Sequence, residues 1–144
     1  MDGTGRSQGR IAEFQSGDGL PGHEATCLLC PHGCRLRDGW SGLCRVRRNE
    51  GGLIRPVQYG RVAAVALDPV EKKPLRHFMP GTWTFSVGFY GCNLRCPYCQ
   101  NFSLSMADLQ REARTDEARL ASARPMDSSE IVAGALRSGA PSIS

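Results

Sequence analysis

The seven cysteines of this chain fall into two short stretches, and this grouping constrains the fold more than any other feature. Four lie between positions 27 and 44, three lie between 92 and 99, and the rest of the 144 residues contain none. An odd number does not suit a fully paired set of disulfides, and clustered cysteines in a reducing compartment are typically metal ligands or catalysts. We therefore expect metal-binding or catalytic loops rather than a disulfide framework.

Charge and hydropathy exclude several classes of protein. The net charge is +4, and only the patch Arg45-Val46-Arg47-Arg48 is densely basic, so we expect no nucleic-acid partner. No apolar run approaches the ~20 residues of a membrane span, and the first residues lack a secretory signal. We therefore expect a cytoplasmic protein without a membrane partner. Residues 1–22 contain six glycines and are expected to form a flexible leader.

The residues that follow predict an α/β chain. Residues 23–58 form a cysteine-rich module with little periodicity, which a bound metal would stabilise. Strands are expected at 59–67 and 83–90, joined by a proline-rich loop at 68–81, and the second strand leads directly into the cysteines. Trp83, Phe85 and Phe89 alternate along it and are expected to face the core.

Two helices and a further strand are expected after the second cysteine group. Residues 106–123 are rich in Ala, Arg, Glu and Leu and favour an exposed helix. Asp127 with Glu130 resembles a capping box at the start of a second helix, which Gly139 would end. Residues 141–144 then begin a strand. The order strand, cysteine loop, helix, strand is that of a βα repeat.

The second cysteine group reads Gly91-Cys92-Asn93-Leu94-Arg95-Cys96-Pro97-Tyr98-Cys99-Gln100-Asn101. Iron–sulfur clusters are normally held by four cysteine thiolates, so three thiolates leave one iron without a protein ligand. An open coordination position is where chemistry on a bound molecule takes place. Two alternatives remain open. A zinc site would need a fourth ligand such as His77, and a thioredoxin-like dithiol at Cys96 and Cys99 would leave Cys92 without a role.

The spacing Cys-x3-Cys-x2-Cys, with Tyr98 directly before the last cysteine, resembles the signature of the radical S-adenosylmethionine superfamily. The loop Asp68-Pro69-Val70-Glu71-Lys72-Lys73-Pro74-Leu75, with His77-Phe78 and Pro80-Gly81 after it, resembles the subgroup called AmmeMemoRadiSam system radical SAM enzymes. That subgroup is related to the activating enzymes of glycyl-radical enzymes, such as the pyruvate formate-lyase activating enzyme. The resemblance runs from about Thr26 to the C-terminus and is weakest at 107–123.

The resemblance implies that Cys92, Cys96 and Cys99 bind a [4Fe–4S] cluster, whose open iron takes the amino and carboxylate groups of S-adenosylmethionine. One electron, from a donor such as flavodoxin or ferredoxin, then cleaves the cofactor to methionine and a 5′-deoxyadenosyl radical. That radical abstracts a hydrogen atom from a substrate that the resemblance does not identify. Tyr98 would lie near the adenine. Memo-like and AMMECR-type proteins are the partners that the subgroup's name implies.

The resemblance also implies a partial (β/α)6 barrel preceded by the cysteine-rich module. Only 45 residues follow Cys99, so residues 59–144 are expected to form the beginning of such a barrel. We accordingly expect the chain to be an N-terminal fragment of a longer enzyme and to be inactive by itself.

The first cysteine group, Cys27, Cys30, Cys34 and Cys44, has the spacing Cys-x2-Cys-x3-Cys-x9-Cys and is part of the same resemblance. It matches neither a zinc ribbon nor the bacterial ferredoxin pattern. Four soft ligands suit zinc or a second iron–sulfur cluster, and reduced thiols without a metal remain an alternative. His32 could replace one of the cysteines.

Several residues near the second group have less specific roles. Lys72, Lys73 and His77 lie on a loop close to the cysteine-bearing strand and are expected to be solvated, with an opening to the cofactor as the alternative. Glu71 is expected to pair with one of the lysines. Gln100 and Asn101 would order the cysteine loop or contact substrate.

Three competing functions follow from these patterns. Within the radical class, the chain would belong to an activase of a glycyl-radical enzyme. Outside it, the chain would be a non-catalytic zinc-binding module that uses Cys27 to Cys44 to bind a partner. The third function is a thiol–disulfide oxidoreductase at Cys96 and Cys99.

Overall fold

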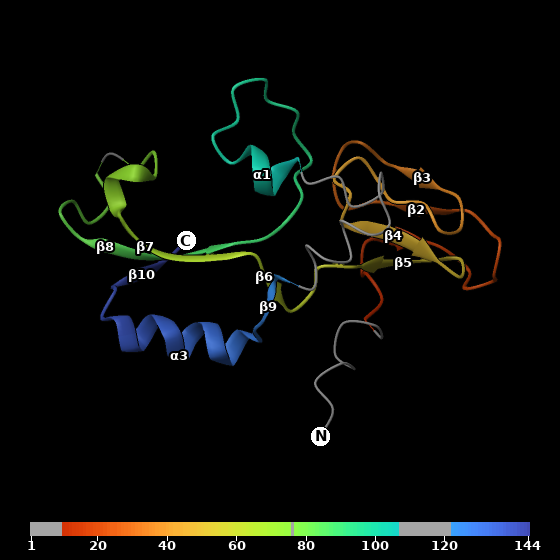
Figure 1. Cartoon of the computed structure of the whole chain (residues 1–144). Helices are drawn as coiled ribbons and strands as arrows, with labels where there is room; N and C mark the ends of the chain where they lie inside the picture. The colour runs from red at the N-terminus through yellow and green to blue at the C-terminus, as the bar shows by residue number, and fades with distance from the viewer. Residues whose placement is uncertain (1–9, 76, 107–121) are drawn as a thin grey trace.

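The computed structural model describes residues 10–75, 77–106 and 122–144. These residues form four small sheets and no closed barrel. Figure 1 shows the cysteine-rich strands on one side and the largest sheet on the other. The elements are β1 (Gln15–Ser16), β2 (Ala25–Cys27), β3 (Arg35–Leu36), β4 (Arg47–Glu50), β5 (Leu53–Pro56), β6 (Arg61–Val62), β7 (Ala64–Pro69), the 3₁₀ helix η1 (Val70–Lys72), β8 (Trp83–Gly88), α1 (Phe102–Ser105), β9 (Arg124–Pro125), α3 (Ser128–Ser138) and β10 (Ser142–Ile143).

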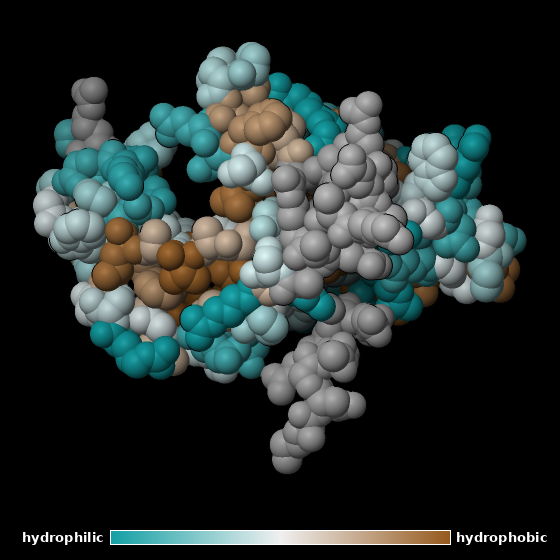
Figure 2. All heavy atoms as spheres, in the orientation of Figure 1, coloured by the Kyte–Doolittle hydropathy of each residue, from teal (hydrophilic) through white to brown (hydrophobic). Residues whose placement is uncertain are grey.

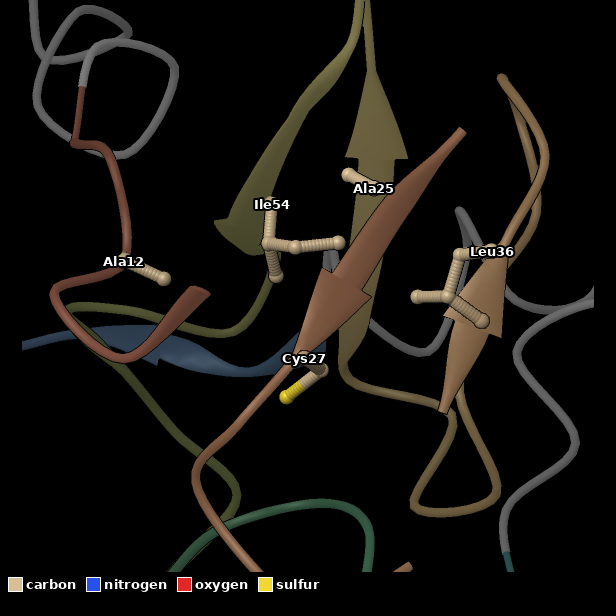
Figure 3. Close-up of a cluster of buried hydrophobic side chains, with 5 residues drawn as sticks. All are labelled: Ala12, Ala25, Cys27, Leu36 and Ile54. Atoms are coloured by element: carbon tan, nitrogen blue, oxygen red, sulfur yellow. The ribbon is translucent and has the colours of Figure 1, made fainter. Parts of the chain in front are cut away.

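The cysteine-rich part is organised around a small apolar cluster. The antiparallel sheet β1-β2-β3 and the hairpin β4–β5 enclose this cluster. Figure 3 shows its five buried side chains, which are Ala12, Ala25, Cys27, Leu36 and Ile54. Five side chains bury little apolar surface. The stability of this part of the chain therefore depends on its hydrogen bonds as well.

The first residues of the described chain belong to this module. Ala12 is buried in the cluster, and its amide donates to the Ile54 carbonyl at 2.9 Å. The Gln15 side chain accepts a hydrogen bond from the Ile54 amide, and β1 pairs with β2. The expected flexible leader at 1–22 therefore needs correction for residues 10–22, because they complete the first sheet. Residues 1–9 lie outside the described part.

Asn49 joins the hairpin to the first sheet. Its side chain is fully buried, and its amide nitrogen donates to the carbonyl oxygens of His23 and Leu36, both at 2.8 Å. Buried carbonyl groups need such partners because they have left water. This residue therefore joins the hairpin to the segment just before β2 and to the end of β3.

The largest sheet has the order β10-β8-β7 and leads into the second cysteine group. β7 and β8 pair antiparallel from Ala64↔Gly88 to Pro69↔Trp83, and β10 lies parallel to β8. Parallel neighbours require a crossover, and the described helices α1 and α3 both lie within it. The strand expected at 83–90 is confirmed as β8, which ends at Gly88. The strand expected at 59–67 is divided into β6 and the longer β7, and the strand expected at 141–144 is confirmed as β10.

Helices α1 and α3 lie on opposite faces of this sheet, as Figure 1 shows. A Cβ atom at Gly134 of α3 would lie 3.0 Å from the Phe85 ring, so this helix packs closely on one face. On the other face, a Cβ atom at Gly88 would lie 3.3 Å from a methyl carbon of Leu104 in α1. Phe85 and Gly88 are three residues apart, so their side-chain positions point to opposite faces.

Helix α3 begins and ends at the residues that the sequence predicts. Asp127 is the N-cap, its carboxylate accepts from the Glu130 amide at 2.9 Å, and Glu130 accepts from the Asp127 amide at 2.8 Å. Gly139 ends the helix with φ of 71°. The capping box and the C-terminal glycine are confirmed. The helix expected at 106–123 falls mainly outside the described residues.

The expected core position of the aromatic residues on β8 is only partly right. Phe85 is buried at 7% exposure, but Trp83 and Phe89 are 54% and 45% exposed. α3 packs on Phe85 in the middle of the strand through Gly134, whereas Trp83 lies at the start of β8 and Phe89 lies just beyond its end. Figure 2 shows the resulting apolar side chains at the surface beside this sheet.

Candidate metal centre

The loop of the second cysteine group leaves the C-terminal end of β8 and returns to the sheet through α1. Cys92, Cys96 and Cys99 are free thiols and are all partly exposed. The Leu94 amide donates to the Cys92 sulfur at 3.4 Å, and the Cys99 sulfur lies 3.1 Å from the Ser105 hydroxyl oxygen. The loop closes at its base, because the Gly91 amide donates to the Leu104 carbonyl at 2.9 Å.

Two of the other residues expected to matter in this loop have clear positions. Tyr98 is 85% exposed, so its ring is free to contact a bound molecule. The Asn101 carbonyl accepts hydrogen bonds from Leu104, at 2.9 Å, and from Ser105, at 2.8 Å, so this residue orders the start of α1.

The first cysteine group lies at the edge of the small apolar cluster. Cys27 is buried, Cys34 packs beside it, and the Cys27 amide donates to the Cys34 carbonyl at 2.9 Å. Cys30 lies in the turn between them, where its carbonyl accepts from Gly33. Gly42, two residues before Cys44, is close to Cys34, whose sulfur lies 3.4 Å from the Cβ position of that glycine. All four thiols are free.

The cysteines of each group are near one another in the chain, but their side chains do not converge. Within residues 10–75, 77–106 and 122–144, no three His, Cys, Asp or Glu side chains lie close enough together to hold a metal ion. Binding at either group therefore requires the thiols to turn toward a common centre. The donor sets themselves fit soft metals, because all seven sulfurs are unpaired thiols and soft thiolates select zinc, copper(I) and iron–sulfur clusters.

His32 does not lie among the thiols as a replacement ligand. Its Nε2 atom is 2.8 Å from the carbonyl oxygen of Asn93, in the second cysteine group. A carbonyl oxygen only accepts, so Nε2 carries the hydrogen in this contact. The same nitrogen is therefore not available as a metal ligand in this arrangement.

A polar network covers the sheet face that α1 shares. Asp68 receives hydrogen bonds from Lys72 at 2.9 Å, from Ser86 at 2.8 Å and from Lys73 at 3.4 Å. The Ser86 hydroxyl is also 3.2 Å from that of Ser144. The bonds from Lys72 and then Ser86 lower the pKa of Asp68 from 3.8 to about 2. The carboxylate is therefore charged at neutral pH.

This network changes the expected roles of the proline-rich loop. Glu71 does not pair with a lysine, because its carboxylate accepts from the Gly81 amide at 2.7 Å, and this bond lowers its pKa. Asp68 takes both lysines instead. The lysines are nevertheless exposed to different extents, with 66% for the Lys72 side chain and 28% for Lys73. The signal in the sequence was the i,i+4 spacing of Asp68 and Lys72, which suits a carboxylate–ammonium pair.

The space above this polar face is open. Figure 2 shows a gap over the sheet between the loop that carries η1 and the segment that carries α1. A separate cavity of about 410 Å³, lined by Val65, Phe85, Met126 and Gly134 among others, lies between the sheet and α3. That cavity is on the face opposite α1, so it does not adjoin the cysteine loop.

Comparison with known proteins gives one informative match. Over 125 residues, the chain is 39% identical to the uncharacterized protein MJ0808 of Methanocaldococcus jannaschii. The match covers 87% of this chain and 35% of the archaeal protein, so the chain spans about a third of the length of that relative. No family model matches the chain, and no solved structure matches it. In the described part of the chain, no helix has both the length and the apolar character needed to cross a membrane.

Proposed function

We propose that this chain is the cluster-binding portion of a radical S-adenosylmethionine enzyme, with Cys92, Cys96 and Cys99 as the ligands of a [4Fe–4S] cluster. The observation that supports this most is the position of the three free thiols directly after β8. β8 is the central strand of its sheet and has a parallel neighbour. In open α/β sheets, ligands bind beyond the carboxyl ends of such strands.

The three cysteines, Tyr98 and Asn101 each have a defined part in this proposal. When bound, the cluster and S-adenosylmethionine supply a 5′-deoxyadenosyl radical that abstracts a hydrogen atom from the substrate. The three thiolates hold the cluster and leave one position open. Tyr98, which is largely exposed, contacts the adenine. The turn at Asn101 holds the loop in place at α1.

The polar face of the sheet would form one wall of the space next to the cofactor. Asp68 and Ser86 lie on the α1 face, and the lysines of the proline-rich loop stand beside them. Because Asp68 stays charged, it holds both ammonium groups at the edge of this space. The substrate would enter between that loop and the cysteine loop, where Figure 2 shows the gap.

The first cysteine group provides a second metal site in the same proposal. Cys27, Cys30, Cys34 and Cys44 bind zinc most simply, or a second cluster. The whole protein would act in the cytoplasm with an electron donor such as flavodoxin or ferredoxin, and with Memo-like and AMMECR-type partners. The fold would be the start of a partial barrel, to which β8, α3 and β10 contribute one repeat.

Anaerobic reconstitution with iron and sulfide tests the proposal on the protein that carries this chain. The wild-type protein should bind iron and sulfide and, with a reductant, convert S-adenosylmethionine to 5′-deoxyadenosine. Cys92→Ser, Cys96→Ser and Cys99→Ser should each abolish that product, while Cys30→Ser should retain the cluster at the second group. Absence of 5′-deoxyadenosine from a protein loaded with iron and sulfide would overturn the proposal.

The competing functions predict different outcomes of the same experiment. Zinc without iron or sulfide would favour a non-catalytic binding module. Turnover of insulin disulfides that survives in Cys92→Ser would favour a thiol–disulfide oxidoreductase at Cys96 and Cys99. A glycyl radical in a co-produced protein would identify the reaction as activation of a glycyl-radical enzyme.

A further inference from the structure

The two cysteine-bearing segments, far apart in the sequence, lie against each other in the structure (Figure 1). One close approach is at Gly91, the residue before Cys92, which has φ of 85°. A Cβ atom there would lie 2.5 Å from the carbonyl oxygen of Cys44 and 2.5 Å from a methyl carbon of Val46. The end of the first cysteine group therefore touches the start of the second at the level of the backbone.

Hydrogen bonds connect the same two segments at three further points. The His32 ring donates to the Asn93 carbonyl at 2.8 Å, across 61 residues of sequence. The Arg95 guanidinium donates to the Leu43 carbonyl at 3.1 Å. The Arg45 guanidinium donates to the Met106 carbonyl, just after α1. The contacts hold both the first turn of the cysteine loop and its exit.

The backbone of Arg45 supports a specific role for these contacts. Arg45 has φ of 67°, in the left-handed region that disfavours residues with a Cβ atom. Such a conformation persists where the surrounding structure determines it, and it is concentrated at functional sites. Here it lies within the turn closed by the bond from the Arg45 amide to the Gly42 carbonyl, and the side chain of the same residue reaches the cysteine loop.

We propose that the segment from Cys27 to Val46 clamps the loop that carries Cys92, Cys96 and Cys99. The positioning residues are His32 and Arg45 on the clamping segment and Arg95 on the loop itself. The inference rests on the proposed function for what the loop holds, but the clamp itself is a property of the chain without a cluster. A loop that is ordered beforehand loses less conformational freedom when it binds a ligand. Loss of residues that orient metal ligands typically costs about 10–100-fold in metal affinity or activity.

Hydrogen exchange of the chain without metal tests the clamp directly. In His32→Ala and Arg95→Ala, amides within 91–106 should exchange several-fold faster than in the wild type, while amides of the β4–β5 hairpin should be unchanged. His32→Gln should restore slow exchange, because its side-chain amide can donate to the Asn93 carbonyl. The unchanged hairpin also shows that the variants fold.

Matched controls come from the same module. His23 is exposed and bonds to Asp18 at 2.7 Å, and Arg35 has an 80% exposed side chain that faces Glu24. Neither of these contacts reaches the cysteine loop, so His23→Ala and Arg35→Ala should leave exchange in 91–106 at the wild-type rate. Equal exchange in the clamp variants and these controls would overturn the clamp.

Cluster retention then separates this inference from the proposed function. After anaerobic reconstitution, His32→Ala and Arg95→Ala should lose iron to a chelator about tenfold faster than the wild type, with an altered electron paramagnetic resonance line shape. If the variants exchange faster but the wild type binds no cluster, the clamp stands and the proposed function fails. If the wild type binds a cluster and all variants retain it and exchange equally, the proposed function stands and the clamp fails.

Discussion

The carboxylate of Asp68 and the hydroxyl of Ser86 meet across the β7–β8 pair, with 2.8 Å between their oxygen atoms. Ser86 lies in the strand that leads into the cysteine loop, and Asp68 is the penultimate residue of β7, which leads into the lysine-bearing loop. The bond therefore links the two loops that border the gap above the sheet. Because Lys72 also bonds to Asp68, the orientation of the lysine loop depends on the charge of this carboxylate.

Asp68 should make the stability of the protein depend on pH. Its pKa is lowered from 3.8 to about 2, so the folded state favours the charged form. This contribution is fully present above about pH 4 and is lost as pH falls through about 2. The unfolding midpoint in urea, followed by tryptophan fluorescence, should be lower for Asp68→Asn than for the wild type at pH 7. The difference between the two urea midpoints should become smaller as the pH falls from 4 to 2.

Glu13→Gln is the control, because Glu13 is exposed and is far in the sequence from the residues of this network. Its midpoint should follow that of the wild type over the whole range. A gap for Asp68→Asn that is the same at pH 7 and at pH 2 would show that the charge of Asp68 contributes nothing.

Gly91→Ala should destabilise the base of the cysteine loop. The left-handed backbone should cost about 1–2 kcal/mol, and the clash with the Cys44 carbonyl should add about 1–3 kcal/mol. Gly81→Ala is a matched control, because Gly81 has φ of 78° but no atom within 4 Å of its Cβ position. It should show the conformational cost alone. Equal unfolding free energies for the two variants would contradict the close contact at Gly91.

Asn49→Ala should destabilise the cysteine-rich module by about 1–3 kcal/mol, because the buried carbonyl of Leu36 and the partly buried carbonyl of His23 lose their partner. Urea unfolding measures the change. Glu50→Ala, at the next and exposed position of β4, should change the free energy by less than about 1 kcal/mol. A loss for Asn49→Ala no larger than that for Glu50→Ala would mean that the buried amide does not hold the module together.

Asp127→Ala should weaken α3 by about 1 kcal/mol, since the N-cap side chain satisfies the Glu130 amide. Ser128→Ala, at the exposed first position of the helix, serves as the control. Thermal unfolding followed by circular dichroism should show a lower midpoint for Asp127→Ala. Indistinguishable midpoints for the two variants would show that the capping box does not stabilise α3.

Local signals in the sequence predicted the elements that depend on neighbouring residues. Asp127, Glu130 and Gly139 predicted both ends of α3, because caps act within a few residues of the helix. The aromatic and β-branched residues of β8 predicted that strand and the loop that follows it. These elements position the second cysteine group, so the sequence alone was sufficient to locate it.

Contacts between distant residues were not predictable from the same patterns. The glycines around Gln15 predict a flexible leader, but the partner of its side chain is the Ile54 amide, thirty-nine residues away. His32 was considered as a metal ligand, yet it bonds to Asn93 in the other cysteine group. Neither pairing leaves a periodic or spacing signal. Trp83 was expected in the core because it alternates with Phe85, but burial depends on what covers each position, which alternation does not reveal.

The most direct test of the account is the electron paramagnetic resonance spectrum of the reduced, reconstituted protein before and after addition of S-adenosylmethionine. We expect a reduced cluster of about four irons at the second cysteine group, and a spectrum that changes on addition because the cofactor binds the iron without a cysteine ligand. Cys92→Ser, Cys96→Ser and Cys99→Ser should remove this signal. A cluster signal that is unaffected by S-adenosylmethionine, or that survives in all three variants, would contradict the central claim.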